Sequence, residues 1–194
     1  AIHIITAISS VAVGVVTAAM ICVLSVMNGF GVMVEQLFSQ FDPDLRITAK
    51  TGKTFTISTE QKEILLGLPC VDLLSESIQE TALVYFEDKQ MPVQLMGVDS
   101  AFGEMSGIEN IITDGHYEVY DGAFDRPVLG QGLAWKLGIG ARFINALQVY
   151  APKREGKVNM LRPDANFNIE RCFIAGTFAV NQQKYDDNMM LVDI

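Results

Sequence analysis

The first 34 residues of the chain contain no Asp, Glu, Lys or Arg, and 24 of them are apolar. All 23 acidic and 14 basic residues of the 194-residue sequence therefore lie from Glu35 onward, where they leave a net charge of −9. An apolar run of this length needs either lipid or a protein core around it. The rest of the chain has the composition of an ordinary globular domain, so the sequence predicts two physically different parts.

The stretch from Ile4 to Met27 is long enough to span a membrane. Its 24 uncharged residues make a helix of about 36 Å, against a hydrocarbon core of about 30 Å. A removed signal peptide would have a basic start and a shorter apolar stretch, and a buried helix of a soluble protein seldom runs this long without charge. We therefore predict a transmembrane helix, in which recurring small residues favour packing in a helix bundle: Ala7, Ser10, Gly14, Ala18 and Ser25.

The helix is predicted to continue beyond the membrane as an amphipathic stalk. Val34, Leu37, Phe38 and Phe41 follow the 3.6-residue helical period, which places them on one face. We expect this face to be buried against the following domain or a partner helix. Asp42-Pro43 should end the helix, because proline disfavours the helical conformation of the residue before it. Residues 1–41 thus form the transmembrane helix and stalk.

The remaining sequence mixes strand and helix patterns and predicts an α+β domain. Thr59 is the expected N-cap of a helix that Gly67 and Pro69 end, and a second helix is expected over residues 131–137, closed by Gly138. The polar residues 87–90 separate two β-rich runs and predict a hairpin. The expected strands are residues 45–49, 55–57, 81–86, 91–98, 145–150, 169–178 and 189–192.

The charged part of the chain argues against several functions. Nucleic-acid binding requires clustered Lys and Arg, and Lys153, Arg154 and Lys157 are too few in a chain of net charge −9. An acidic cluster could suggest a cation site, but it lacks the ligand spacing and glycine of a calcium loop, and we expect a solvated acidic loop. The cluster comprises Asp114, His116, Glu118, Asp121 and Asp125.

Nucleotide chemistry is also not expected in this chain. Gly130-Gln131-Gly132 begins like a dinucleotide-binding fingerprint, but Trp135 occupies the place of the third glycine. The sequence has no phosphate-binding loop, no nucleophile elbow and no metalloprotease motif. We therefore expect a non-catalytic protein. The three cysteines form no framework by spacing, and whether Cys70 and Cys172 pair is left open.

Three stretches carry a family resemblance. Residues 23–30, VLSVMNGF, resemble the signature of the first transmembrane helix of the lipoprotein-releasing (Lol-type) permeases, which belong to the MacB/FtsX-like ABC transporter permeases. Residues 128–138 are similar to the external-domain segment "v-l-G-x-x-L-A-x-x-L-G" of that family. Residues 175–178, followed by Tyr185-Asp186, are similar to its "G-x-F … Y-D" ending. The resemblance spans nearly the whole chain.

The resemblance implies a two-lobed periplasmic domain after the helix. A porter-like lobe would comprise residues 42–98 plus 145–194, and a sabre-like lobe, residues 99–144, would be inserted in it. The chain would lie in the bacterial inner membrane, with residues after about 41 in the periplasm. It would be a piece of a longer permease, with further membrane helices after Ile194.

The resemblance also implies partners. A separate cytoplasmic ATPase subunit would bind ATP and Mg²⁺, so no cofactor is expected in this chain. A second permease subunit would complete a homo- or heterodimer, and a lipoprotein would be the substrate handed to a periplasmic carrier. Two alternatives remain: a sibling permease, either a MacB-like efflux subunit or an FtsX-like regulator of a cell-wall hydrolase, and a single-span receptor with a sensing ectodomain.

Two groups of residues are candidates for substrate handling. Near the outer end of the predicted span, the side chains that would face lipid or lipoprotein are Val23, Val26, Met27, Phe30 and Val34. The alternative for this group is packing on other membrane helices. The resemblance places a carrier-hooking loop in residues 151–163, where apolar side chains interrupt a polar run; its candidates are Lys157, Met160, Leu161, Arg162 and Pro163. The alternative for this loop is a short strand, residues 158–161, packed on the porter-like lobe.

Overall fold

The computed structural model describes residues 2–38, 43–122, 124–141, 146–153 and 166–194. The chain divides into two compact units, residues Ala1–Asp42 and Pro43–Ile194. The first is a single helix and the second is a mixed domain built on one sheet. The predicted α+β class, with a long apolar N-terminal helix before a β-sheet domain, is confirmed.

Helix α1 runs from Ile2 to Phe38 without interruption. At about 1.5 Å per residue, its 37 residues measure about 55 Å. Two polar side chains are satisfied within the helix, because Thr6 Oγ1 donates to the Ile2 carbonyl at 3.0 Å and Thr17 Oγ1 donates to the Val13 carbonyl at 2.8 Å. Such internal hydrogen bonds suit a helix in hydrocarbon, where water cannot serve as partner.

The predicted stalk face is only partly described. Val34 is half-buried. The side chains of Leu37 and Phe38, and the whole of Phe41, lie outside the described residues. The packing of this face therefore stays a prediction.

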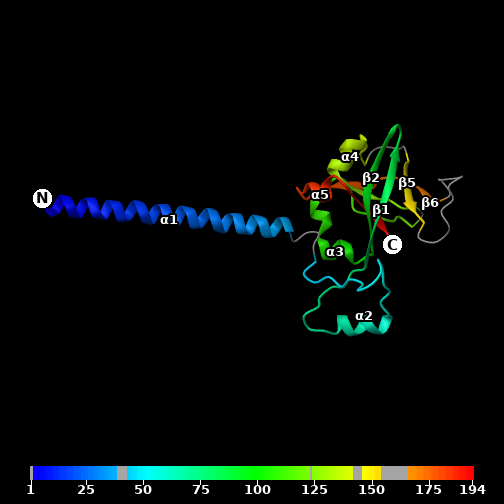
Figure 1. Ribbon diagram of the computed structural model, residues 1–194, viewed down its shortest axis with the longest axis horizontal. Coiled ribbons are helices and arrows are strands. Elements are labelled where there is room, and N and C mark those ends of the chain that lie inside the picture. Colours follow the sequence, from blue (N-terminus) through cyan, green and yellow to red (C-terminus); the bar gives the residue numbers. More distant parts are fainter. Residues whose placement is uncertain (1, 39–42, 123, 142–145, 154–165) are drawn as a thin grey trace. The chain divides into compact units, whose positions relative to one another are not determined.

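The second unit contains an eight-stranded sheet in the order β3-β7-β4-β8-β2-β1-β5-β6. Figure 1 shows the long β1–β2 hairpin running through it. The strands are β1 Ser77–Phe86, β2 Lys89–Val98, β3 Ile112–Gly115, β4 Val128–Gly130, β5 Leu147–Pro152, β6 Phe167–Cys172, β7 Gly176–Phe178 and β8 Met189–Asp193.

The predicted hairpin is confirmed and is longer than its β-rich runs. Strands β1 and β2 pair antiparallel from Ser77 opposite Val98 to Phe86 opposite Lys89. The turn between them is short, and Glu87 adopts a positive φ of 52° there. Strand β1 also pairs with β5, and β2 pairs in parallel with β8. The hairpin thus joins the two halves of the sheet.

The two predicted helices are present. Helix α2 spans Thr59–Leu66, but its N-cap is Ser58 and not Thr59. The Ser58 hydroxyl accepts from the Gln61 N–H at 3.3 Å, and the Gln61 side chain accepts from the Ser58 N–H at 3.1 Å. Helix α4 spans Gln131–Leu137 and ends at Gly138, whose φ of 78° suits a glycine C-cap. Shorter helices are α3 Phe102–Ser106, η1 Ile108–Ile111 and α5 Gln183–Asp186.

Two expected strands before α2 are wrong. Residues 45–49 and 55–57 have alternating or β-branched sequences, yet the structure has no strand in the described residues 43–58. Alternation makes a strand only when a neighbouring strand supplies hydrogen bonds. Leu45 and Phe55 remain exposed instead.

A third expected strand, residues 169–178, is two strands. Strand β6 ends at Cys172, and β7 begins at Gly176. They lie in different places, because β6 forms one edge of the sheet and β7 lies between β3 and β4. The intervening residues carry the chain from one half of the sheet to the other. Residues 169–178 have β propensity throughout, so the sequence did not reveal that the chain leaves one strand neighbour and joins others within this segment.

The segment expected as an inserted lobe contributes to the same sheet. Strands β3 and β4 both come from residues 99–144, and β4 pairs with β7 and β8 of the flanking segments. Helix α4, from the same segment, packs its buried Leu133 and Leu137 into the main core. The assignment of porter-like and sabre-like lobes stays a proposal based on the resemblance.

The core lies between α4 and one side of the sheet. Val84, Leu129, Leu133, Leu147 and Met190 are all fully buried there. Burying one such side chain contributes about 1.5–3 kcal/mol, so this cluster fixes α4 on the sheet.

The three cysteines are free thiols. Cys70 is exposed and Cys172 is buried. Burial raises the pKa of the Cys172 thiol to about 12, with a smaller contribution from the Asp125 and Glu170 carboxylates. The structure therefore has no disulfide between Cys70 and Cys172.

Candidate functional site

The apolar helix contains the first group of candidate residues. Within the described chain, one helix, Ile2–Val34, is long and apolar enough to cross a membrane. Its side chains from Ile2 to Met33 are exposed in the helix unit. Among the candidates, Val26 is 71% exposed, and Val34 is half-buried.

These candidates share one face of α1. At 100° per residue, positions 23, 26, 27, 30 and 34 fall within a sector of about 100°. Val32 lies on the opposite face at similar depth and is also exposed. The helix therefore presents a continuous apolar stripe, although uncharged side chains surround it on all sides. This all-round apolarity is typical of a membrane-embedded helix.

The second group of candidates lies outside the described residues. Lys157, Met160, Leu161, Arg162 and Pro163 all fall between residues 154 and 165. The choice between a carrier-hooking loop and a packed strand therefore stays a prediction.

The two external-domain stretches that carry the family resemblance lie together in the sheet. Strand β4, from the first stretch, pairs in parallel with β7, from the second, and Val128 lies opposite Gly176. The residues after β4 form α4, and the residues after β7 lead into α5. The two stretches that resemble the family, although distant in sequence, thus form one structural unit.

Close backbone approach explains the glycines of this unit. A Cβ on Gly130 would meet the backbone carbonyls of Asp186 and Tyr185, and a Cβ on Gly132 would meet the Asp187 carboxylate. The glycine spacing that begins like a dinucleotide fingerprint therefore allows α5 to pack against β4 and α4.

Polar contacts hold α5 in this position. The Val180 N–H donates to Asp186 Oδ1 at 2.8 Å, and Lys136 Nζ of α4 lies 2.8 Å from Asp187 Oδ2. The hydrogen bond from Lys136 lowers the pKa of the Asp187 carboxyl. A carboxyl with a lowered pKa favours the folded state above its usual pKa and loses that contribution as the pH falls.

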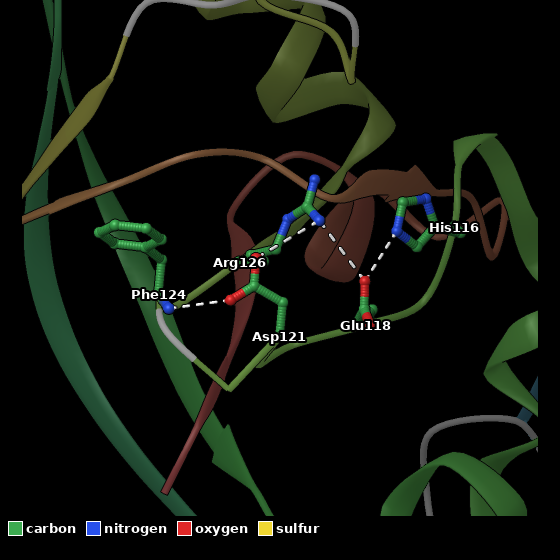
Figure 2. A network of polar contacts seen from close by, with 5 residues as sticks. All are labelled: His116, Glu118, Asp121, Phe124 and Arg126. Atoms are coloured by element: carbon green, nitrogen blue, oxygen red, sulfur yellow. Dashed lines mark hydrogen bonds and ion pairs between the residues drawn. The ribbon is translucent and has the colours of Figure 1, made fainter.

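Two carboxylates of the acidic cluster, Glu118 and Asp121, lie around Arg126, as Figure 2 shows. Arg126 Nη1 lies 3.5 Å from Glu118 Oε2 and 3.7 Å from Asp121 Oδ2. His116 Nε2 is 3.0 Å from the same Glu118 oxygen, and the Phe124 N–H donates to Asp121 Oδ1 at 2.9 Å. Among the described residues, no group of three His, Cys, Asp or Glu side chains is arranged to hold a metal ion.

Arg126 is the residue that sequence reasoning missed in this cluster. It also lines a shallow hollow of about 280 Å³, together with Asp121, Phe124 and Phe173. The two phenylalanine rings meet edge to face, with centroids 6.5 Å apart. A single arginine directly after a run of carboxylates was the available signal for the ion pairs. The approach of Phe173 had no local signal.

Comparison with known proteins decides the family. Residues 6–192 match the model of the MacB-like periplasmic core domain. The chain belongs to this family. The match includes most of α1 and nearly all of the sheet domain, so the MacB-like resemblance predicted from the sequence is confirmed at the family level.

The MacB-like chain also has a similar solved structure. The extracellular domain of the noncanonical ABC-type transporter YknZ from Gram-positive bacteria aligns with a TM-score of 0.47 and 14% identity. The alignment covers 71% of this chain and 62% of that one, so it spans less than two thirds of the YknZ domain. No match was found among curated proteins.

Proposed function

We propose that this chain is the first membrane helix and periplasmic domain of an ABC transporter permease subunit that releases lipoproteins from the inner membrane to a periplasmic carrier. The family match over residues 6–192 is the observation that supports the permease assignment. Residues 23–30, with their similarity to the Lol-type helix signature, support the lipoprotein-releasing branch.

The unbroken helix α1 suits mechanical coupling. Its 37 residues extend about 55 Å, whereas about 20 residues cross the hydrocarbon. A continuous helix can carry a displacement of its membrane part into the segment beyond. The motion would originate in a separate cytoplasmic ATPase, which would bind ATP and Mg²⁺, as the resemblance to the Lol-type permeases implies. The chain itself would be non-catalytic.

The stripe of Val23, Val26, Met27, Phe30 and Val34 would contact the acyl chains of the lipoprotein. These side chains are uncharged, and those from Val23 to Phe30 are exposed in the helix unit. Each acyl CH₂ buried against such a surface contributes about 0.8 kcal/mol. The competing role is packing against helices of the second permease subunit or of the same permease.

Photo-crosslinking separates these roles. A photoreactive phenylalanine analogue at Met27 or Phe30 of the full permease, assembled with its ATPase in membranes, should form adducts with lipoproteins. The matched control is the same analogue at Val32, on the opposite helix face. We expect adduct yield at least about five-fold higher at Met27 or Phe30, since crosslinking requires contact. Equal yields, or adducts only with permease helices, would assign the stripe to helix packing.

The MacB-like efflux role is the second candidate, because the matching family model is described as a MacB-like periplasmic core domain. Depleting the chain in its host distinguishes the two. Lipoprotein release predicts that lipoproteins accumulate in the inner membrane fraction while their total amount is unchanged. Efflux predicts normal lipoprotein distribution with increased sensitivity to apolar compounds, and an FtsX-like role predicts a cell-separation defect. A receptor role predicts none of the three.

A further inference from the structure

Strand β6 forms an edge of the sheet. Among the described residues, β5 is the only strand that pairs with it, and Figure 1 shows β6 outermost, beyond β5. The Lys153 N–H donates to the Asn166 carbonyl at 2.9 Å, so these opposite residues form a hydrogen-bonded pair. Because bonded and non-bonded pairs alternate along an antiparallel ladder, Asn168, Glu170 and Cys172 also direct their backbone groups toward β5.

The residues between them direct their backbone groups away from β5. These residues are Phe167, Ile169 and Arg171, and their N–H groups are spaced about 6.8 Å apart along the strand. Pro152 fits this register, because it lies opposite Phe167 in a pair that exchanges no hydrogen bonds. Three N–H and three C=O groups therefore line the edge, and none of them has a backbone hydrogen-bond partner among the described residues.

The opposite edge of the sheet, β3, is less suited to adding a strand. It has four residues, and its register shifts between Ile112 and Asp114. Asp114 Oδ2 also accepts a hydrogen bond from the Ala141 N–H at 3.3 Å. Short and irregular edges resist pairing with another chain. Strand β6, in contrast, has six residues in continuous register with β5 and contains no proline.

The side chains of β6 determine which segment would fit. Ile169 is 48% exposed and lies opposite Tyr150, whose ring centroid is 6.3 Å from that of Phe167. Glu170 and Arg171 are both exposed, and they point to opposite sides of the sheet because side chains alternate along a strand. An added antiparallel strand would therefore be stabilised by an apolar residue opposite Ile169, a basic one opposite Glu170 and an acidic one opposite Arg171.

We infer that β6 binds an extended segment of a partner protein, which pairs antiparallel with β6 and extends the eight-stranded sheet. An extended backbone is the ligand that can bond to N–H and C=O groups repeated every two residues. The opposite charges of Glu170 and Arg171 select the register of the segment. The inference goes beyond the proposed function, because it concerns how a partner protein is held and does not depend on the transported substrate.

A peptide of matching sequence tests the pairing. The probe is Glu-Lys-Ile-Thr-Val, acetylated and labelled with fluorescein at its carboxyl end, and binding to the full chain in detergent is measured by fluorescence anisotropy. With its isoleucine opposite Ile169, the first, third and fifth residues direct their N–H groups to β6, and the second and fourth direct theirs to solvent. The unmodified peptide should bind saturably.

Backbone N-methylation provides the matched comparison. Methyl groups on the first and third nitrogens remove two donors and obstruct the ladder, so affinity should fall at least about ten-fold. Methyl groups on the second and fourth nitrogens point to solvent and should change affinity by less than about two-fold. The two peptides have the same composition and differ only in which edge of the peptide is blocked.

Exchanging the first two residues of the peptide tests the charges. The sequence Lys-Glu-Ile-Thr-Val places like charges opposite Glu170 and Arg171, and its affinity should be about five-fold lower at low salt. The difference should diminish as the salt concentration rises, because both side chains are exposed. Equal affinity of the two sequences at low salt would contradict the proposed register.

Two substitutions in the chain separate backbone from side chain. Ile169→Pro removes an N–H that points away from β5, which an edge strand tolerates, and should weaken peptide binding at least about ten-fold. Ile169→Ala keeps the N–H and should have the smaller effect. Hydrogen exchange of Val149, which lies opposite Glu170 in a bonded pair, reports whether β5 and β6 stay paired. If the proline variant loses this pairing, the methylated peptides decide with the unaltered chain.

Three results would overturn the inference. The first is no saturable binding of the unmodified peptide. The second is equal affinity of the two N-methylated peptides, which would mean that the peptide binds without main-chain pairing. The third is a lower particle mass of Ile169→Pro in light scattering, which would mean that this edge pairs copies of the same chain.

Discussion

Replacing Leu129 by alanine is expected to lower the free energy of unfolding of the sheet domain by about 2–5 kcal/mol, the range for leucine truncation in a packed core. Leu129 is fully buried on β4. It lies opposite Thr177 of β7 and Met190 of β8. The cavity left by truncation would therefore open in the middle of the sheet, at the junction of three strands.

Hydrogen exchange of the full chain in detergent, read by mass spectrometry on peptides from β4 and β8, measures this loss. Exchange in these peptides should accelerate at least about 30-fold, which corresponds to 2 kcal/mol. The matched control is Leu73→Ala, because Leu73 is exposed, and exposed substitutions change stability by about 0.5 kcal/mol or less. Similar exchange in both variants would mean that Leu129 is not a core residue.

Local signals account for the elements that the sequence predicted. The polar turn between two β-rich runs was enough to predict the β1–β2 hairpin, since its strands are adjacent in the chain. Helix α4 was predicted with its observed bounds, because Gly138 marks the C-cap, where the positive φ favours glycine. The long apolar helix α1 was predicted from its lack of charge alone.

Non-local pairing explains the errors. Residues 169–178 have strand propensity throughout, but whether they form one strand or two depends on the positions of β5 and β3, which are distant in sequence. Residues 45–49 and 55–57 have the pattern of strands but pair with no strand among the residues that the structure describes. Propensity describes which residues fit a sheet, and tertiary contacts decide which of them enter one.

Arrangements of side chains differed in how far the sequence could predict them. The helix stripe could be predicted from composition and helical periodicity. The alignment of Leu83, Tyr150 and Ile169 across three strands could not, because only the register of the sheet brings these residues side by side. The structural role of Gly130 was also hidden, because the residues it approaches lie more than 50 positions later in the chain.

Replacing Gly130 by alanine is expected to lower the free energy of unfolding by about 1–3 kcal/mol or more, because the added methyl group would overpack the site. Gly130 has φ −58° and ψ 138°, which any residue can adopt. The cost is therefore steric, because the new Cβ would lie 2.7 Å from the Tyr185 carbonyl oxygen and closer still to that of Asp186. These are backbone atoms, so relief requires α5 to move away from β4.

Gly140→Ala is the matched control for this substitution. Its new Cβ would have ordinary contact, 3.4 Å from Asp114 Oδ2, and replacing glycine also reduces the entropy of the unfolded chain. Hydrogen exchange should therefore accelerate in the peptide that contains Asp186 and the Val180 N–H only in Gly130→Ala. If Gly130 instead served a bound phosphate, as in a dinucleotide fold, the same change would leave exchange in α5 unaltered. The measurement thus separates a packing glycine from a ligand-binding one, although both follow the same sequence pattern.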